Sequence, residues 1–184
     1  MLDVAPRLLG GVLRHGEVAL RLTEVEAYDG ARDPGSHAYR GLTPRNATMF
    51  GPAGHLYVYF TYGMHYCCNV VCGEEGAASA VLLRAGEVVA GTALAQERRR
   101  GARPRDLARG PARLCVALGI DRDLDGCDLA RGPVTFELPR VPASEVNSGP
   151  RVGLRHAAER PWRFWLPGEE TVSAYRPAAP RTRD

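Results

Sequence analysis

Residues 23–28 read TEVEAY, and their alternation predicts an extended strand at the centre of this chain. Leu22, Glu24, Glu26 and Tyr28 occupy every second position, so a strand would direct all four side chains to one face. Two carboxylates and a phenol would then share a surface. A solvated strand face is the ordinary outcome of such a pattern. A pocket there would instead raise the pKa of one carboxyl through burial and like-charge repulsion, which prepares a group for acid–base catalysis.

A second alternating region covers residues 54–71. Residues 55–60 and 65–71 alternate like strands, and residues 61–64 between them have the character of a tight turn. These features predict a hairpin with Tyr62 at its tip. An aromatic side chain on an exposed turn either folds back onto the hairpin or binds something, and the functional alternative is a wedge inserted between stacked bases.

The rest of the chain predicts strands and helices without a regular alternation of the two. We expect strands over residues 17–28, 80–85, 134–138 and 162–166, and helices within 4–13, 88–101 and 111–118. Residues 29–46, rich in glycine and proline, form a long loop of the kind that is usually functional or mobile. Five or six strands with two or three helices predict an α+β fold: a single compact domain on a mostly antiparallel, curved sheet with a protruding β-hairpin and a few peripheral helices. We place this domain at residues 1–176 and expect residues 177–184 to form a frayed tail.

The composition is that of a globular protein, with 45% hydrophobic and 24% charged residues among 184. The formal net charge of +3 is too small to imply nucleic-acid binding by itself. No apolar run approaches the roughly 20 residues that a membrane span needs, so no membrane partner is expected. The five cysteines lack the spacing of a disulfide scaffold, and no signal-like segment precedes them. We therefore expect a reducing, cytoplasmic setting.

Two of three candidate chemistries are disfavoured by the sequence. A metal site could be drawn from His65, Cys67, Cys68 and Cys72, but their spacing matches no standard zinc pattern. Small buried thiols are the better interpretation, so no metal is predicted. A cysteine nucleophile would need a histidine and an electropositive niche, and the sequence localises neither.

The third chemistry combines one carboxylate with an arginine and an aromatic slot. A carboxylate can take a proton from water while its charge stabilises an oxocarbenium-like sugar, which is the chemistry of glycosidic-bond cleavage. Glu24 and Glu26 project from the same side of one strand and cannot flank a substrate, so a single working carboxylate is expected. The residues of this candidate site are Glu26, Arg84, Tyr28, His37 and Tyr59.

Several longer motifs stand out along the chain: Thr23–Tyr28, His37, Thr43–Asn46, Gly54–Tyr59, Tyr62–Met64, Asn69, Val81–Ala85, Gly110–Cys115 and Arg151–Gly153. These motifs closely resemble those of the alkyladenine (3-methyladenine) DNA glycosylase family. They follow one another in the family's order and continue to about Trp165, so the resemblance covers nearly the whole chain and is highly specific.

The resemblance implies a monofunctional DNA glycosylase of base-excision repair. Such an enzyme flips an alkylated or deaminated purine out of duplex DNA, hydrolyses its N-glycosidic bond with a Glu-activated water and leaves an abasic site. Its partner would be double-stranded DNA containing a damaged purine, with the protein a bacterial, nucleoid-associated monomer. No cofactor is implied. Aromatic faces in the pocket would favour cationic alkylated bases through cation–π attraction.

The resemblance also implies roles for single residues. Glu26 would be the general base, and Arg84 would hold the water together with the backbone carbonyl of Val152. The others would enclose the base (Tyr28, His37, Tyr59), exclude normal purines (Asn69), fill the gap in the duplex (Tyr62) and, less firmly supported by the motifs, contact the DNA backbone (Thr43, Arg45). Cys68 stands where a bulkier residue such as Met is expected, which predicts a looser pocket floor.

The basic residues bear on lyase activity, because all 24 of them are arginines. Glycosylases that also nick the backbone form a Schiff base through an amine, and here only the α-amino group could supply one. We therefore expect hydrolysis without lyase activity.

Two alternatives remain open at the level of the sequence. The first is a lesion- or RNA-binding module that turns nothing over, which intact Glu26 and Arg84 disfavour. The second is a hydrolase of another N-glycoside such as a free nucleoside. Tyr62 distinguishes this second alternative from a DNA glycosylase, because a nucleoside hydrolase has no gap in a duplex to fill.

Overall fold

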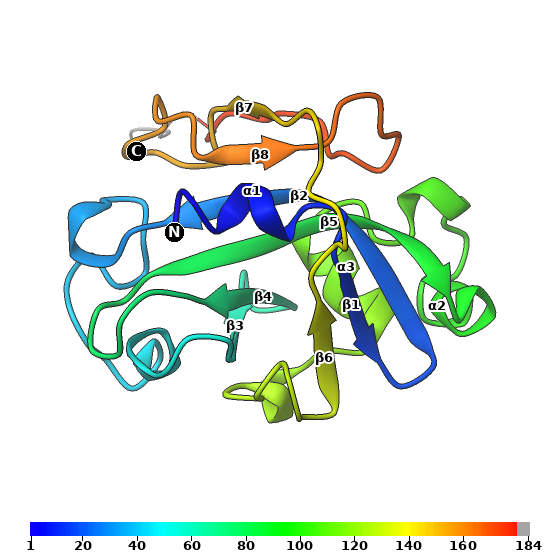
Figure 1. Ribbon diagram of the computed structural model, residues 1–184, viewed down its shortest axis with the longest axis horizontal. Helices are drawn as coiled ribbons and strands as arrows, with labels where there is room; N and C mark the ends of the chain where they lie inside the picture. The colour runs from blue at the N-terminus through cyan, green and yellow to red at the C-terminus, as the bar shows by residue number, and fades with distance from the viewer. Residues whose placement is uncertain (180–184) are drawn as a thin grey trace.

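The computed structural model describes residues 1–179, which fold around an eight-stranded sheet whose strand pairs are all antiparallel (Figure 1). The strands are β1 Val12–His15, β2 Val18–Tyr28, β3 Leu56–Thr61, β4 His65–Val71, β5 Ala80–Ala90, β6 Val134–Glu137, β7 Asn147–Gly149 and β8 Arg163–Trp165. The helices are α1 Ala5–Leu8, α2 Thr92–Arg98 and α3 Pro111–Leu118, with 3-10 turns η1 Gly30–Arg32, η2 Ala47–Phe50, η3 Pro104–Asp106 and η4 Arg122–Leu124.

Strand β2 is the centre of this architecture. The sheet runs β3-β4-β5-β2-β1-β6, and β8, which also pairs with β7, joins β2 beyond the end of β1. One edge of β2 is therefore occupied by β5, while the other is shared by β1 and β8. Nine of its eleven residues are buried, all but Arg21 and Tyr28. The predicted strand at the TEVEAY stretch is confirmed, and it lies inside the molecule.

The sheet is strongly curved, and the pairing of β2 with β5 shows why. Its register shifts three times between Ala19 and Val25, and such irregularities bend a strand and increase its twist. Near the bend Gly86 approaches the carbonyl of Arg21 so closely that a Cβ would lie 2.7 Å from that oxygen. Helix α3 packs against β4 and β5 and buries Leu114 and Leu118 in the main core. The predicted α+β fold on a curved antiparallel sheet is confirmed.

Several predicted boundaries were wrong. The strand expected to end at residue 85 continues to Ala90, because β5 stays paired with β2 over its whole length. The helix expected from residue 88 therefore begins only at Thr92, after Gly91 takes a left-handed φ of 67°. Strands β1 and β7 were not predicted, since four and three residues are too few to show a period. The sheet consequently has eight strands rather than five or six.

The predicted hairpin is confirmed as β3 and β4, joined at Tyr62 and Gly63. Both residues have positive φ, 52° and 66°, the sign pattern of a type I′ turn, and the amide of Met64 donates to the carbonyl of Thr61 at 3.2 Å. The predicted helix at residues 111–118 is also confirmed, from Pro111 to a left-handed Gly119.

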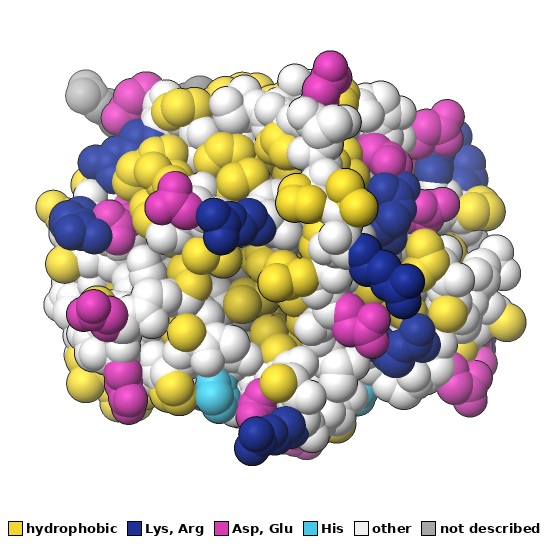
Figure 2. Space-filling view, viewed as in Figure 1, with side chains coloured by type: hydrophobic (Ala, Val, Ile, Leu, Met, Phe, Trp, Pro, Cys, Tyr) yellow, Lys and Arg dark blue, Asp and Glu magenta, His cyan; other side chains and the backbone are white. Residues whose placement is uncertain are grey.

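The C-terminal residues and the molecular surface complete the description of the fold. Residues 177–179 have no regular structure, and the rest of the predicted tail, residues 180–184, lies outside the described residues. Within the described part of the chain, no helix has the length and apolar character required to cross a membrane. On the face shown in Figure 2, arginines and acidic side chains are interspersed around a central group of apolar side chains.

Candidate functional site

A cavity of about 190 Å³ lies between the end of β2, the β3–β4 hairpin, the loop of residues 29–46 and the segment 152–154. Eight of the predicted site residues line it: Glu26, Tyr28, His37, Tyr59, Tyr62, Asn69, Arg84 and Val152. The remaining two, Thr43 and Arg45, lie outside it. With Arg84 contributed by β5, residues from five separate segments converge on one space, as a binding or catalytic site requires.

Glu26 is the carboxylate that faces this cavity, and its side chain is fully buried. Its Oε1 accepts from the amide of Val152 at 2.7 Å and lies 3.3 Å from Nη1 of Arg84, and its Oε2 accepts from the Tyr28 hydroxyl at 2.8 Å. A carboxylate offers about four acceptor positions. Among the described residues, two hydrogen bonds and the ion pair with Arg84 orient Glu26, and acceptor capacity is left for a further donor such as water.

Glu24, the other carboxylate of the strand, does not line the cavity and is held by buried donors behind it. Its oxygens accept from Nε of Arg84 at 2.8 Å, from Nε of Arg163 at 2.7 Å, and from the amide and hydroxyl of Ser173 at 2.7 and 2.9 Å. Burial would raise the pKa of Glu24, but Arg84 and Arg163 outweigh it and hold this pKa below its ordinary value of 4.5. The expectation of a solvated strand face is therefore wrong. The raised carboxyl pKa that a pocket was expected to produce is not found at Glu24.

Arg84 links the two carboxylates. It is 6% exposed, and its Nε contacts Glu24 while its Nη1 approaches Glu26. Burial opposes its charge, but Glu26 and Glu24 together raise the pKa of the guanidinium. Two guanidiniums, Arg84 and Arg163, thus compensate two buried carboxylates, and Glu24 fixes where Arg84 lies beside Glu26.

Aromatic rings line the same cavity. The rings of His37 and Tyr59 meet edge to face with centroids 4.5 Å apart, and Tyr57 stacks on Tyr59 at 5.4 Å. Burial and then Glu26 raise the pKa of Tyr28 well above its usual range, so its hydroxyl remains a donor. Burial and the nearby Arg45 lower the pKa of His37, which favours a neutral imidazole.

Tyr57 lines the cavity but was not predicted as a site residue. Its ring is 1% exposed and its hydroxyl lies 3.4 Å from Nδ1 of His37. The signal was present in the sequence, because residues 57 and 59 of an alternating strand share a face. Asn69, paired with Tyr57 across β3 and β4, is 4% exposed and closes the same side of the cavity.

The loop of residues 29–46 is held in place by two polar side chains. Asn46 donates to the carbonyls of His37 and Gly41, both at 3.0 Å, and so closes the end of the loop. Arg45 donates to the carbonyl of Phe60 at 2.9 Å and remains exposed beside the hairpin, as does Thr43 in the same loop. Their predicted contact with DNA stays a prediction.

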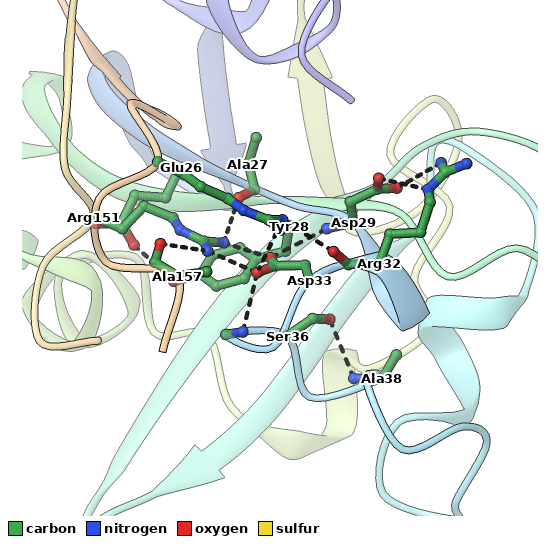
Figure 3. A network of polar contacts seen from close by, with 12 residues as sticks. Glu26, Ala27, Tyr28, Asp29, Arg32, Asp33, Ser36, Ala38, Arg151 and Ala157 are labelled. Carbon is green, nitrogen blue, oxygen red and sulfur yellow. Dashed lines mark hydrogen bonds and ion pairs between the residues drawn. The ribbon is translucent and has the colours of Figure 1, made fainter. Parts of the chain in front are cut away.

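A buried ion pair between Arg151 and Asp33 joins this loop to the segment after β7 (Figure 3). Nη2 of Arg151 donates to Asp33 at 2.7 Å, and Nη1 also donates to the carbonyl of Ala27 at 2.9 Å. Burial opposes the Asp33 charge, but Arg151 holds the pKa of that carboxyl below its ordinary value. Only the neighbouring Val152 was predicted, because nothing in the sequence shows that Arg151 reaches Asp33.

A second cleft, of about 280 Å³, adjoins the first, because Arg84 and Val152 line both. Its further basic residues are Arg109, Arg113 and Arg176, with Asp106 as its carboxylate. Arg113 and Arg176 are exposed. This basic cleft was missed at the level of the sequence because its arginines come from distant segments.

The cysteines lie as thiols in and near the core. Cys67 faces the cavity, and burial raises its pKa to about 11, which leaves a protonated and weakly nucleophilic thiol. Cys68 points to the main core instead, so a smaller side chain there does not loosen the pocket floor as expected. His65 is exposed at the hairpin, away from the buried Cys72.

Comparison with known proteins gives one consistent result. The sequence model of the family described as methylpurine-DNA glycosylase (MPG) matches residues 1–170. A protein of Streptomyces avermitilis named "Putative 3-methyladenine DNA glycosylase" is 56% identical, with 100% of this chain and 91% of that protein aligned. Proteins of the same name from Leifsonia xyli subsp. xyli and Frankia casuarinae are 59% and 54% identical; the alignments cover 95% and 96% of this chain and 88% and 89% of those proteins.

Proposed function

Because this chain belongs to the methylpurine-DNA glycosylase family, we propose that it releases damaged purines from duplex DNA as a monofunctional glycosylase. The observation that carries the proposal is the Glu26 carboxylate, buried at the end of an aromatic-walled cavity and oriented by Val152, Tyr28 and Arg84. A carboxylate with free acceptor capacity can bind a water and take its proton as the N-glycosidic bond breaks.

The other residues of the cavity would hold the base. Tyr28, Tyr59 and His37 supply flat faces and edges on which a planar purine can stack, and the buried Asn69 amide would exclude normal purines by unfavourable contact. Arg84 would help to hold the water, together with the carbonyl of Val152, whose amide already contacts Glu26. Base flipping brings the nucleotide into this space, and a damaged base costs least to unstack.

The surface around the cavity suits a DNA duplex. Tyr62 is 84% exposed at the hairpin tip and, with the exposed Met64 beside it, presents an apolar wedge to an emptied place in the base stack. The basic cleft with Arg113 and Arg176 adjoins the cavity and would take a backbone phosphate. Thr43 and Arg45 would contact the backbone on the hairpin side.

The proposal is tested by single-turnover release of base from a labelled duplex carrying one hypoxanthine or one 7-methylguanine. We expect base release with an intact strand that breaks only after alkali treatment, since the chain has no lysine to form a Schiff base. Damaged duplex that is bound while no base is released would contradict the enzyme and favour a binding module. Strand breaks before alkali treatment would contradict a monofunctional mechanism.

Replacing Tyr62 with Ala separates a DNA glycosylase from a nucleoside hydrolase. We expect release from duplex DNA to fall by roughly tenfold or more, because loss of stacking in the gap removes about 1–3 kcal/mol of binding. Any hydrolysis of the free nucleoside should be unaffected. Leu138→Ala, which also removes an exposed apolar side chain but lies just after β6 and outside the cavity, serves as the matched control. Equal loss on both substrates would argue against the wedge.

A further inference from the structure

Arg151 stands behind one wall of the base cavity. Its guanidinium carbon lies 4.6 Å from the centre of the Tyr28 ring and 5.1 Å from that of Trp162, so the charge is enclosed between two aromatic faces. The side chain is fully buried and is the largest such side chain in the described part of the molecule. Tyr28 lines the cavity and Arg151 does not, so a base bound in the cavity would meet the Tyr28 ring and not the guanidinium that lies over it.

A cation on one face of an aromatic ring changes what the other face attracts. The π system of Tyr28 offers negative potential on both faces, and Arg151 already uses one of them. A positively charged base stacked on the free face would also be repelled by the guanidinium across the ring, with little water between the two charges. A neutral base of the same shape would meet no such repulsion.

The carboxylate of Asp33 moderates this effect. It pairs with Arg151 through both guanidinium Nη atoms, and neither side chain is exposed. Gly35 allows the loop to come this close, because a Cβ there would lie 2.9 Å from Nη2 of Arg151. Figure 3 shows the guanidinium reaching between the Asp33 carboxylate and the Ala27 carbonyl, beside Tyr28.

We propose that the Arg151–Asp33 pair sets the selectivity of the cavity between cationic and neutral damaged bases, acting through the Tyr28 ring. The inference rests on the proposed glycosylase function and adds a selectivity-determining charge that does not touch the substrate. Arg151 lowers the preference for a cationic base, and Asp33 partly restores it.

The test compares single-turnover release of cationic 7-methylguanine with release of neutral hypoxanthine, expressed as a ratio of rates. Arg151→Met leaves a negative charge behind Tyr28 and should raise the ratio by about threefold to tenfold. Asp33→Asn leaves a positive charge there and should lower it by a similar factor. The double variant Arg151→Met/Asp33→Asn has no charge and should lie between the two single variants.

The opposite directions of the two single variants distinguish this role from a structural one. Both variants break the same ion pair, so a defect in folding or in the position of Val152 would slow both substrates together and leave the ratio unchanged. Arg32→Met is the matched control, because Arg32 lies in the same loop as Asp33 but is exposed, pairs with Asp29 instead and does not line the cavity. Its ratio should equal that of the wild type.

The outcomes separate the two proposals. If Arg151→Met does not fold, Asp33→Asn and the double variant still differ only at residue 151, and the ratio should be higher in the double variant. A ratio that is unchanged, or that moves the same way in both single variants, overturns this inference while the glycosylase function stands. A wild type that releases neither base overturns the proposed function itself.

Discussion

Replacing Glu26 with Gln is expected to slow base release by about 10²–10⁴-fold, the range that a positioned general base contributes. Glutamine keeps the size of the side chain and can still accept from the Val152 amide, which donates to Glu26 at 2.7 Å. It cannot take a proton from water. Single-turnover assays on duplexes with hypoxanthine or 7-methylguanine measure the loss, and titration of labelled duplex should show that binding is retained.

Glu75→Gln provides the matched control for this experiment, because Glu75 is exposed and does not line the cavity. Its rate should equal that of the wild type. If the Glu26 variant keeps a rate within a few fold of the wild type, another group activates the water and the proposed role of Glu26 fails. If binding is lost together with the rate, the variant has disturbed the site rather than the chemistry.

Replacing Glu24 with Gln should give the largest change in stability. The substitution leaves Arg84 and Arg163, both nearly fully buried, without their carboxylate, and breaking a buried pair in this way costs about 3–5 kcal/mol. Urea unfolding at pH 7 measures the difference in free energy of unfolding. Glu137→Gln, at an exposed position of β6, should change it little.

The difference in stability between the wild type and Glu24→Gln should also depend on pH. The pKa of Glu24 is lowered by folding, so its contribution to stability is complete above the ordinary value of 4.5 and is lost as the pH falls through the folded-state pKa. The stability difference between wild type and Glu24→Gln should therefore shrink as the pH is lowered below 4.5. A difference that stays constant down to pH 3 would show that the charge of Glu24 is not what holds the network.

The sequence predicted those features that depend on neighbouring residues. Alternation located β2 and the hairpin, and Pro111 and Gly119 marked the two ends of α3. Alternation could not predict that the second edge of β2 is completed by β8, which lies more than 130 residues later in the chain. The predicted start of α2 at residue 88 was too early for a similar reason. Pairing with the distant strand β2 keeps β5 extended to Ala90, and local sequence does not show that pairing.

In the site, too, the residues within local motifs were predicted and the contacts between distant segments were not. Its members within recognisable motifs, such as Glu26 and Asn69, were predicted to gather and do gather around one cavity. The residues that hold them were not predicted. Arg163 reaches Glu24 from β8, and Arg151 reaches Asp33 across 118 residues of sequence, so neither partner follows from local spacing. The roles assigned to the cavity residues stay predictions until the variants above are measured.

At the tip of the hairpin, the proposed wedge and the stability of the fold make opposite demands. Tyr62 has a φ of 52°, a backbone conformation that costs a non-glycine residue roughly 1 kcal/mol or more, and its ring is 84% exposed. Glycine would relieve the backbone strain, and a polar residue would be better hydrated. A laboratory selection for heat resistance alone would therefore replace Tyr62 early, and the most stable descendants of this protein would be those that lack the proposed wedge.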